Sequence, residues 1–79
     1  MAKIRPFTPR KVYQIMDADS NYRSILMFRG EPIEYVSKKR RQAMIYTYDE
    51  AKNVAKYFIE KRNIPVMIEC RNVTERNYL

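Results

Sequence analysis

One segment of this chain carries a consistent set of helix signals, and it leaves the rest of the chain to form strands. Thr47 and Glu50 have the T-x-x-E spacing of a capping box, in which the two residues satisfy each other's backbone N–H groups. An apolar stripe with helical spacing follows, made of Ala51, Val54, Ala55, Phe58 and Ile59. Asn63 can take the left-handed conformation that ends a helix, and Pro65 blocks its continuation. We therefore predict a single helix that begins after Thr47 and ends near Asn63.

The other apolar segments have the lengths and turn signals of β-strands. Runs of β-branched and aromatic residues, separated by turn formers, span residues 11–16, 22–28, 33–36, 42–46 and 66–73. Gly30 is the only glycine and lies between the second and third runs, where a turn needs a positive φ. The order β-β-β-β-α-β predicts an α+β fold, an antiparallel sheet of four to five strands with one helix packed on one face. The position of the last strand in the sheet stays open.

The length of 79 residues predicts one domain. Residues 1–10 are expected to form an extended basic arm, because Pro6 and Pro9 disfavour a helix there. Ile4 and Phe7 give this arm apolar side chains that could pack against the body of the domain. Residues 74–79 are expected to fray as the end of the chain.

Two of the predicted strands are apolar on both faces, which is unusual for a sheet with water on one side. In the second strand, Leu26 and Phe28 alternate with Ile25 and Met27, and residues 42–46 repeat this pattern. A single helix shields only one face, so the other face needs the arm, a second copy of the chain or another partner to cover it. We expect Met27, Met44 and Tyr46 to lie in such an interface. The arm and the tyrosines of the chain remain an alternative cover.

The composition argues against catalysis. The chain has no histidine, so it lacks the usual general base and the commonest metal ligand at neutral pH. One glycine is too few for a phosphate-binding loop, and Asp17 and Asp19 are better explained as turn residues than as a calcium site. Cys70 alternates onto the face under the helix, where we expect a small buried hydrophobe. We therefore predict no enzyme activity, no metal and no cofactor.

The same sequence gives an expectation about the compartment. A single cysteine allows no internal disulfide, and no apolar run is long enough to span a bilayer or to act as a secretory signal. These features predict a cytoplasmic protein with no membrane partner.

The charge of the chain favours an anionic partner. The net charge is +7, and four consecutive cations, Lys38, Lys39, Arg40 and Arg41, follow the third strand. Such a compact group suits phosphates. The predicted nucleic-acid-binding residues are Lys3, Arg5, Arg10, Arg23, Arg29, Lys38, Lys39, Arg40 and Arg41. A solvated basic turn with no ligand is the alternative for the four consecutive cations.

The stretch from Arg41 to Phe58, RQAMIYTYDEAKNVAKYF, resembles the last strand and helix of AP2-type and integrase N-terminal domains. Those families bind DNA with a three-stranded sheet supported by one helix. The resemblance implies that Arg23, Arg29, Lys39 and Arg41 face a DNA groove. The chain departs from the family pattern because Ile45 and Tyr46 stand where a glycine precedes the T-x-x-E-A segment.

The same pattern is similar to small proteins of phages and prophages of Gram-positive bacteria, which often act as accessory or host-interaction factors. Two functions follow as hypotheses. The first is a non-enzymatic protein that binds nucleic acid through residues 38–41 and the N-terminal arm. The second is a protein-interaction or host-inhibitor module for an acidic protein, homodimeric through the uncovered sheet face.

Overall fold

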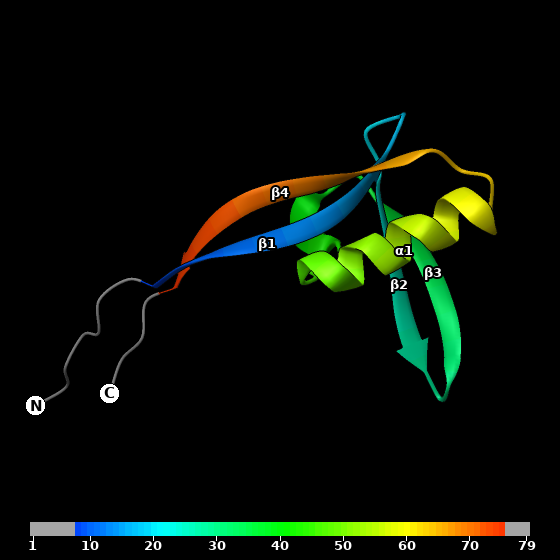
Figure 1. Ribbon diagram of the computed structural model, residues 1–79, viewed down its shortest axis with the longest axis horizontal. Coiled ribbons are helices and arrows are strands. Elements are labelled where there is room, and N and C mark those ends of the chain that lie inside the picture. The colour runs from blue at the N-terminus through cyan, green and yellow to red at the C-terminus, as the bar shows by residue number, and fades with distance from the viewer. Residues whose placement is uncertain (1–7, 76–79) are drawn as a thin grey trace, which may run out of the picture.

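A computed structural model describes residues 8–75 of the chain (Figure 1). Its elements, in chain order, are β1 (Thr8–Asp17), β2 (Tyr22–Phe28), β3 (Glu31–Ser37), a short 3-10 helix η1 (Arg40–Gln42), α1 (Tyr48–Glu60) and β4 (Val66–Glu75). The strands form one antiparallel sheet in the order β3-β2-β1-β4, and α1 packs on one face of it. The predicted α+β class is confirmed. The last strand lies at the edge, next to the first.

The strands β1 and β4 pair along their full length and form a long ribbon that extends away from the β2–β3 hairpin (Figure 1). Thr8 pairs with Glu75 and Arg10 with Val73, so residues 8–10 of the expected arm belong to β1. Thr74 and Glu75, which we expected to fray, belong to β4. The expectations for Lys3, Arg5 and the packing of Ile4 and Phe7 lie outside the described residues.

The helix forms where its sequence predicts, although Ile59 of the predicted apolar stripe is 50% exposed. Thr47 caps α1, its Oγ1 accepting from the Glu50 backbone N at 3.3 Å, and Glu50 Oε1 accepts from the Thr47 N at 2.9 Å. Ala51, Ala55 and Phe58 are buried in a core that includes Ile15 of β1. Asn63 has φ 54°, the left-handed conformation expected after a helix.

The β2–β3 hairpin turns through two residues with positive φ. Arg29 has φ 53° and Gly30 has φ 79°, while Phe28 pairs with Glu31. This is the geometry of a two-residue type I′ turn, whose twist matches that of paired strands. The expectation of a positive φ at Gly30 is confirmed.

The predicted strand at residues 42–46 is wrong except at its last residue. Residues 38–44 instead cross the sheet on the face opposite α1, which we call the reverse face. The side chain of Gln14, buried in β1, donates from Nε2 to the Arg40 carbonyl at 2.8 Å. Ser24 of β2, also buried, accepts from the Met44 N at 3.0 Å. These two polar side chains on the sheet bind the backbone of the crossing segment, which therefore does not need a neighbouring strand.

Tyr46 fills a fork between β1 and β2. These strands pair only at Ile15 with Arg23 and at Met16 with Tyr22, and the same register would continue with Gln14 opposite Ser24 and then Tyr13 opposite Ile25. Tyr46 stands between Tyr13 and Ile25. Its backbone N donates to Tyr13 O at 2.8 Å and its O accepts from Tyr13 N at 3.1 Å. Its hydroxyl accepts from Ile25 N at 2.9 Å and donates to Ile25 O at 3.2 Å. One residue thus satisfies the backbone groups of both strands, and the chain passes through this fork to reach α1.

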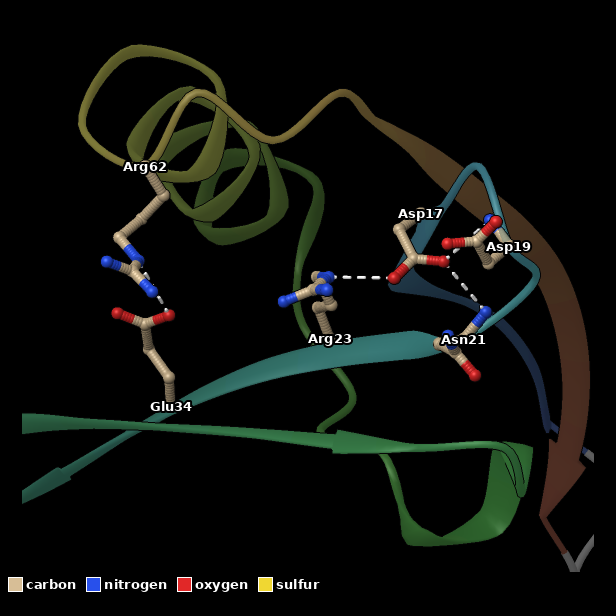
Figure 2. A network of polar contacts seen from close by, with 6 residues as sticks. All are labelled: Asp17, Asp19, Asn21, Arg23, Glu34 and Arg62. Atoms are coloured by element: carbon tan, nitrogen blue, oxygen red, sulfur yellow. Dashed lines mark hydrogen bonds and ion pairs between the residues drawn. The ribbon is translucent and has the colours of Figure 1, made fainter.

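Asp17, at the end of β1, holds the first hairpin loop together (Figure 2). Its Oδ1 accepts from the backbone N of Asp19 at 2.9 Å and of Asn21 at 3.0 Å, and its Oδ2 accepts from Arg23 Nε at 2.8 Å. Burial of the carboxyl by itself raises its pKa, but the hydrogen bonds from Asn21, Arg23 and Asp19 outweigh burial. The net result is a pKa below the ordinary value of 3.8.

This shift predicts how stability depends on pH. The folded pKa of Asp17 lies below the unfolded one, so its contribution is complete above about pH 4 and is lost as the pH falls through the folded pKa. We expect urea unfolding curves measured between pH 6 and pH 2 to show a decline below pH 4 that is smaller in Asp17→Asn. An equal decline in the variant would contradict this role of Asp17.

Candidate nucleic-acid interface

The crossing segment carries the four consecutive cations onto the reverse face of the sheet. One of them, Arg40, is fixed there. Its Nε donates to the Tyr22 hydroxyl at 3.0 Å and lies 3.2 Å from Glu69 Oε1, and the same hydroxyl donates to Glu69 at 3.1 Å. The hydrogen bond to Tyr22, followed by the charge of Glu69, raises the pKa of Arg40 above its ordinary value. Arg40 thus anchors the segment to β2 and β4.

The other three cations of the segment point to solvent. Lys38, Lys39 and Arg41 are exposed and make no ion pair with the part of the chain that the structure describes. Arg10 lies on the same face of β1 as Val12 and Gln14, because side chains alternate along a strand. We call Arg10, Lys38, Lys39, Arg40 and Arg41 the reverse basic surface. A cleft of about 310 Å³ adjoins Arg10, and its lining is of mixed charge because Lys11 of β1 and Glu50 of α1 both contribute to it.

The acidic side chains of the body lie mostly elsewhere. Asp49, Glu50 and Glu60 are on α1, and Glu34 of β3 turns toward the helix side, where it accepts from the Tyr57 hydroxyl at 2.6 Å and pairs with Arg62 (Figure 2). Among the side chains that the structure describes, Glu69 is the acid on the reverse face of β1 and β4, and Arg40 neutralises it. The positive charge of the chain is therefore concentrated on the reverse face and not spread evenly over the surface.

Two of the predicted binding residues are not part of this surface. Arg23 lies on the helix side, paired with Asp17, and its guanidinium sits 6.0 Å from the centre of the Phe58 ring. Arg29 is at the tip of the β2–β3 hairpin, over the ring of Phe28. Arg23 and Arg29 therefore do not share one surface with Lys39 and Arg41, as the resemblance to DNA-binding domains implied.

The three predicted interface residues have different environments. Met27 is 62% exposed, Met44 is half-buried against the core, and Tyr46 is buried in the fork. The exposed apolar surface is instead at the outer half of the hairpin, where Leu26 is 43%, Phe28 55% and Ile33 44% exposed. We call Leu26, Met27, Phe28 and Ile33 the hairpin tip.

Cys70 lies on the predicted face of β4 but is exposed, so the expectation of a buried cysteine is wrong. The reason is the position of β4. It is the edge strand, and the buried residues of α1 pack over Ile15 of β1 and the inner part of β4 near Ile68. At the level of Cys70, the first residue of α1, Tyr48, packs edge-on against Tyr13 of β1 with ring centres 5.3 Å apart.

Sequence reasoning did not single out Arg71 of β4. It pairs with Val12, so it lies on the reverse face, and its Nε is buried without a hydrogen-bond partner among the described groups. The signal is in the sequence: Met67, Glu69 and Arg71 alternate with Cys70, so a cysteine on the helix side puts this cation on the opposite face.

Two searches of the described residues bear on other functions. No group of three or more His, Cys, Asp or Glu side chains in residues 8–75 is arranged to hold a metal ion. None of the helices in that range has the length and apolar character needed to cross a membrane.

Comparisons of the chain with known protein families, with curated proteins and with solved structures find no match.

Proposed function

We propose that this protein is a non-enzymatic binding protein that associates with nucleic acid through the reverse basic surface. The observation that carries the proposal is the separation of charge: the cations of residues 38–41 lie over one face of the sheet, and Glu69, the acid that the described side chains place beside them there, is already paired with Arg40. Anions that approach this face meet Lys38, Lys39 and Arg41 without competition from a neighbouring carboxylate.

The arrangement favours contacts to the phosphate backbone over reading of bases. The part of the sheet that would lie against DNA in a sheet-type DNA-binding domain is filled here by residues 38–44, and α1 is on the opposite face. Lysines and arginines on an irregular segment neutralise phosphates but carry little sequence information. We therefore propose binding with little sequence preference and a strong dependence on salt.

The test is a charge-matched pair of variants. Lys38→Ala/Lys39→Ala/Arg41→Ala removes three exposed cations and leaves Arg40 in its structural contacts. Lys52→Ala/Lys56→Ala/Lys61→Ala removes three exposed cations from the helix side and gives the same net charge. By fluorescence anisotropy with labelled duplex and single-stranded oligonucleotides, we expect the first variant to lose affinity by about tenfold or more. Its log–log salt slope on duplex DNA should fall by about 2–3, since each phosphate contact contributes about 0.9.

Equal losses in the two variants would mean that only net charge matters and would overturn the assignment of the site. Failure of the unaltered protein to bind any of the oligonucleotides at low salt would overturn the proposed function itself.

A second candidate function rests on the hairpin tip. Leu26, Phe28 and Ile33 lie on the reverse face of the hairpin and Met27 on the helix side, and all four side chains are exposed. Such a patch is typical of a protein-interaction surface, and the positive charge of the chain suits an acidic protein partner. In this case Met27→Gln should abolish complex formation with the partner while the triple alanine variant at residues 38, 39 and 41 has little effect. The exposed Cys70 fits a reducing cytoplasm for either function.

A further inference from the structure

The sheet has two edges, and they differ in how well they are protected. The edge strand β3 contains Pro32, which lacks an N–H, and it carries Glu31 and Glu34. Proline and charges on an edge strand are common devices against pairing with another chain. The other edge, β4, runs for ten residues without a proline, and no strand of the described chain lies beyond it.

The contacts of β1 show which backbone groups of β4 point outward. Tyr13 gives both its N–H and its C=O to Tyr46, on the side of β1 away from β4. Its partner in β4 is Cys70, so this is a pair without mutual hydrogen bonds, and Cys70 directs its own N–H and C=O to the open edge. By alternation, Val66, Ile68 and Asn72 do the same.

The side chains next to Cys70 are complementary to a second copy of themselves. Glu69 and Arg71 flank Cys70, and both lie on the reverse face. If two copies of β4 pair antiparallel about a two-fold axis at Cys70, Glu69 of each copy stands opposite Arg71 of the other. The outward groups also match in this register, because Cys70 meets Cys70 and Ile68 meets Asn72.

The neighbouring registers lack this complementarity. A two-fold axis at Glu69 places two carboxylates directly opposite each other, and an axis at Arg71 places two guanidiniums opposite each other. Like charges in such cross-strand pairs are destabilising, whereas opposite charges stabilise. The register centred on Cys70 also brings an acceptor to Arg71, whose buried Nε has no partner within the described chain.

We propose that two copies of this chain associate through the outer edge of β4, with the two-fold axis at Cys70, and form a continuous eight-stranded antiparallel sheet. A two-fold axis perpendicular to the sheet keeps like faces together. The two copies of α1 then lie on one side of the dimer, and the two reverse basic surfaces lie on the other.

The test uses a pair of charge reversals. In the dimer, Glu69→Lys places an ammonium opposite the guanidinium of Arg71, and Arg71→Glu places a second carboxylate opposite Glu69. Each variant alone should therefore raise the dimer dissociation constant by about tenfold or more. A mixture of the two variants pairs one copy of each, which relieves the repulsion between like charges, and should form a one-to-one dimer. Sedimentation equilibrium of each variant and of the mixture measures this.

The mixture works because each copy then carries a single sign of charge at both positions. The Glu69→Lys copy presents two cations and the Arg71→Glu copy presents two carboxylates, so both cross-strand pairs join opposite charges. Glu60→Lys, which makes the same charge change on α1 as Glu69→Lys does on β4, is the matched control and should dimerise as the unaltered protein does.

Cross-linking at Cys70 tests the register directly in the unaltered protein, with Arg71→Glu as the comparison. Cys70 is the only cysteine in the chain, so a short bifunctional maleimide should join two copies of the unaltered protein at this position and far fewer copies of Arg71→Glu. A monomeric unaltered protein, or a dimer that Arg71→Glu does not weaken, would overturn the proposal. A mixture that stays monomeric while each variant keeps its circular dichroism spectrum would overturn the register. Glu69→Lys also loses the contacts of Glu69 with Arg40 and Tyr22. If this variant does not fold, the results for Arg71→Glu and for cross-linking decide whether the dimer forms as proposed.

Discussion

Replacement of Phe58 by alanine is expected to lower the free energy of unfolding by about 3–5 kcal/mol, the cost of removing a large aromatic side chain from a packed core. Phe58 is 0% exposed and lies at the centre of the only buried cluster that the described residues form, between α1 and the sheet. Its ring packs edge-on against Tyr57, with ring centres 5.5 Å apart. A small domain has a total stability of roughly 5–15 kcal/mol, so this one change removes a large part of it.

The next residue of the helix supplies the control. Ile59 is 50% exposed, and Ile59→Ala should cost far less than Phe58→Ala. Phe58→Leu keeps an apolar side chain in the cluster and gives a measurable intermediate if Phe58→Ala does not fold. Chemical denaturation of the three variants orders them. If Phe58→Ala and Ile59→Ala lower the free energy of unfolding equally, the face of α1 that contacts the sheet is not the one that carries Phe58.

The helix could be predicted from sequence because its signals are local. The capping box, the stripe and the left-handed Asn63 involve neighbours within a few residues. The failure at residues 42–46 has a non-local cause. Gln14 and Ser24 look like solvent-facing polar positions of their strands, but both are buried and bind the backbone of the crossing segment. Nothing in residues 42–46 themselves indicates that strands far away supply these partners.

The same limit applies to the surface. The prediction that the sheet is apolar on both faces holds only for the outer part of β2, because residues 42–46 form no strand and the reverse face also carries Tyr22, Gln14, Ser24 and Glu69. Residues 38–44 cover its inner half through contacts to Gln14, Ser24 and Tyr22, and the hairpin tip stays exposed. The exposed cations at residues 38, 39 and 41 could be anticipated from their run. The position of Arg23 on the helix side could not be predicted in this way, because it depends on which face of β2 contacts α1.

The proposed dimer and the proposed nucleic-acid surface reinforce each other physically. Pairing through β4 places two reverse basic surfaces on one side of an eight-stranded sheet. Two linked surfaces bind one nucleic acid more strongly than either alone, because the second contact is intramolecular. Loss of dimerisation in Arg71→Glu should then weaken binding to long oligonucleotides more than binding to short ones.

Tyr46→Phe is expected to be the most costly removal of a single polar atom from this protein. The hydroxyl of Tyr46 both accepts from the N–H of Ile25 and donates to its C=O, in the place that a β1 backbone would occupy in an unbroken ladder. Phenylalanine keeps the ring and the backbone bonds to Tyr13 but leaves these two groups without partners. Each fully buried polar group left unpaired costs about 1–3 kcal/mol. Because Ile25 is only partly buried, we expect the two groups together to cost near the lower end, about 2–3 kcal/mol in the free energy of unfolding.

Stability measurements at alkaline pH distinguish the contribution of the Tyr46 hydroxyl from that of its ring. Burial raises the pKa of Tyr46 above its ordinary value of 10.0, so the folded state holds this proton more tightly than the unfolded chain. Its contribution is complete below pH 10 and is lost as the pH rises through the folded pKa. The unaltered protein should therefore lose stability above pH 10 more steeply than Tyr46→Phe does.

Tyr48→Phe is the matched control for the hydroxyl of Tyr46. Tyr48 lies two residues after Tyr46, and this change also removes a tyrosine hydroxyl. The side chain of Tyr48 is exposed, and its ring makes its contacts with Tyr13 and Lys52. Chemical denaturation at neutral pH should show Tyr48→Phe close to the unaltered protein and Tyr46→Phe clearly less stable. If the two variants are equally stable, Ile25 finds other partners when the hydroxyl is absent. The fork between β1 and β2 would then be held by the backbone of Tyr46 alone.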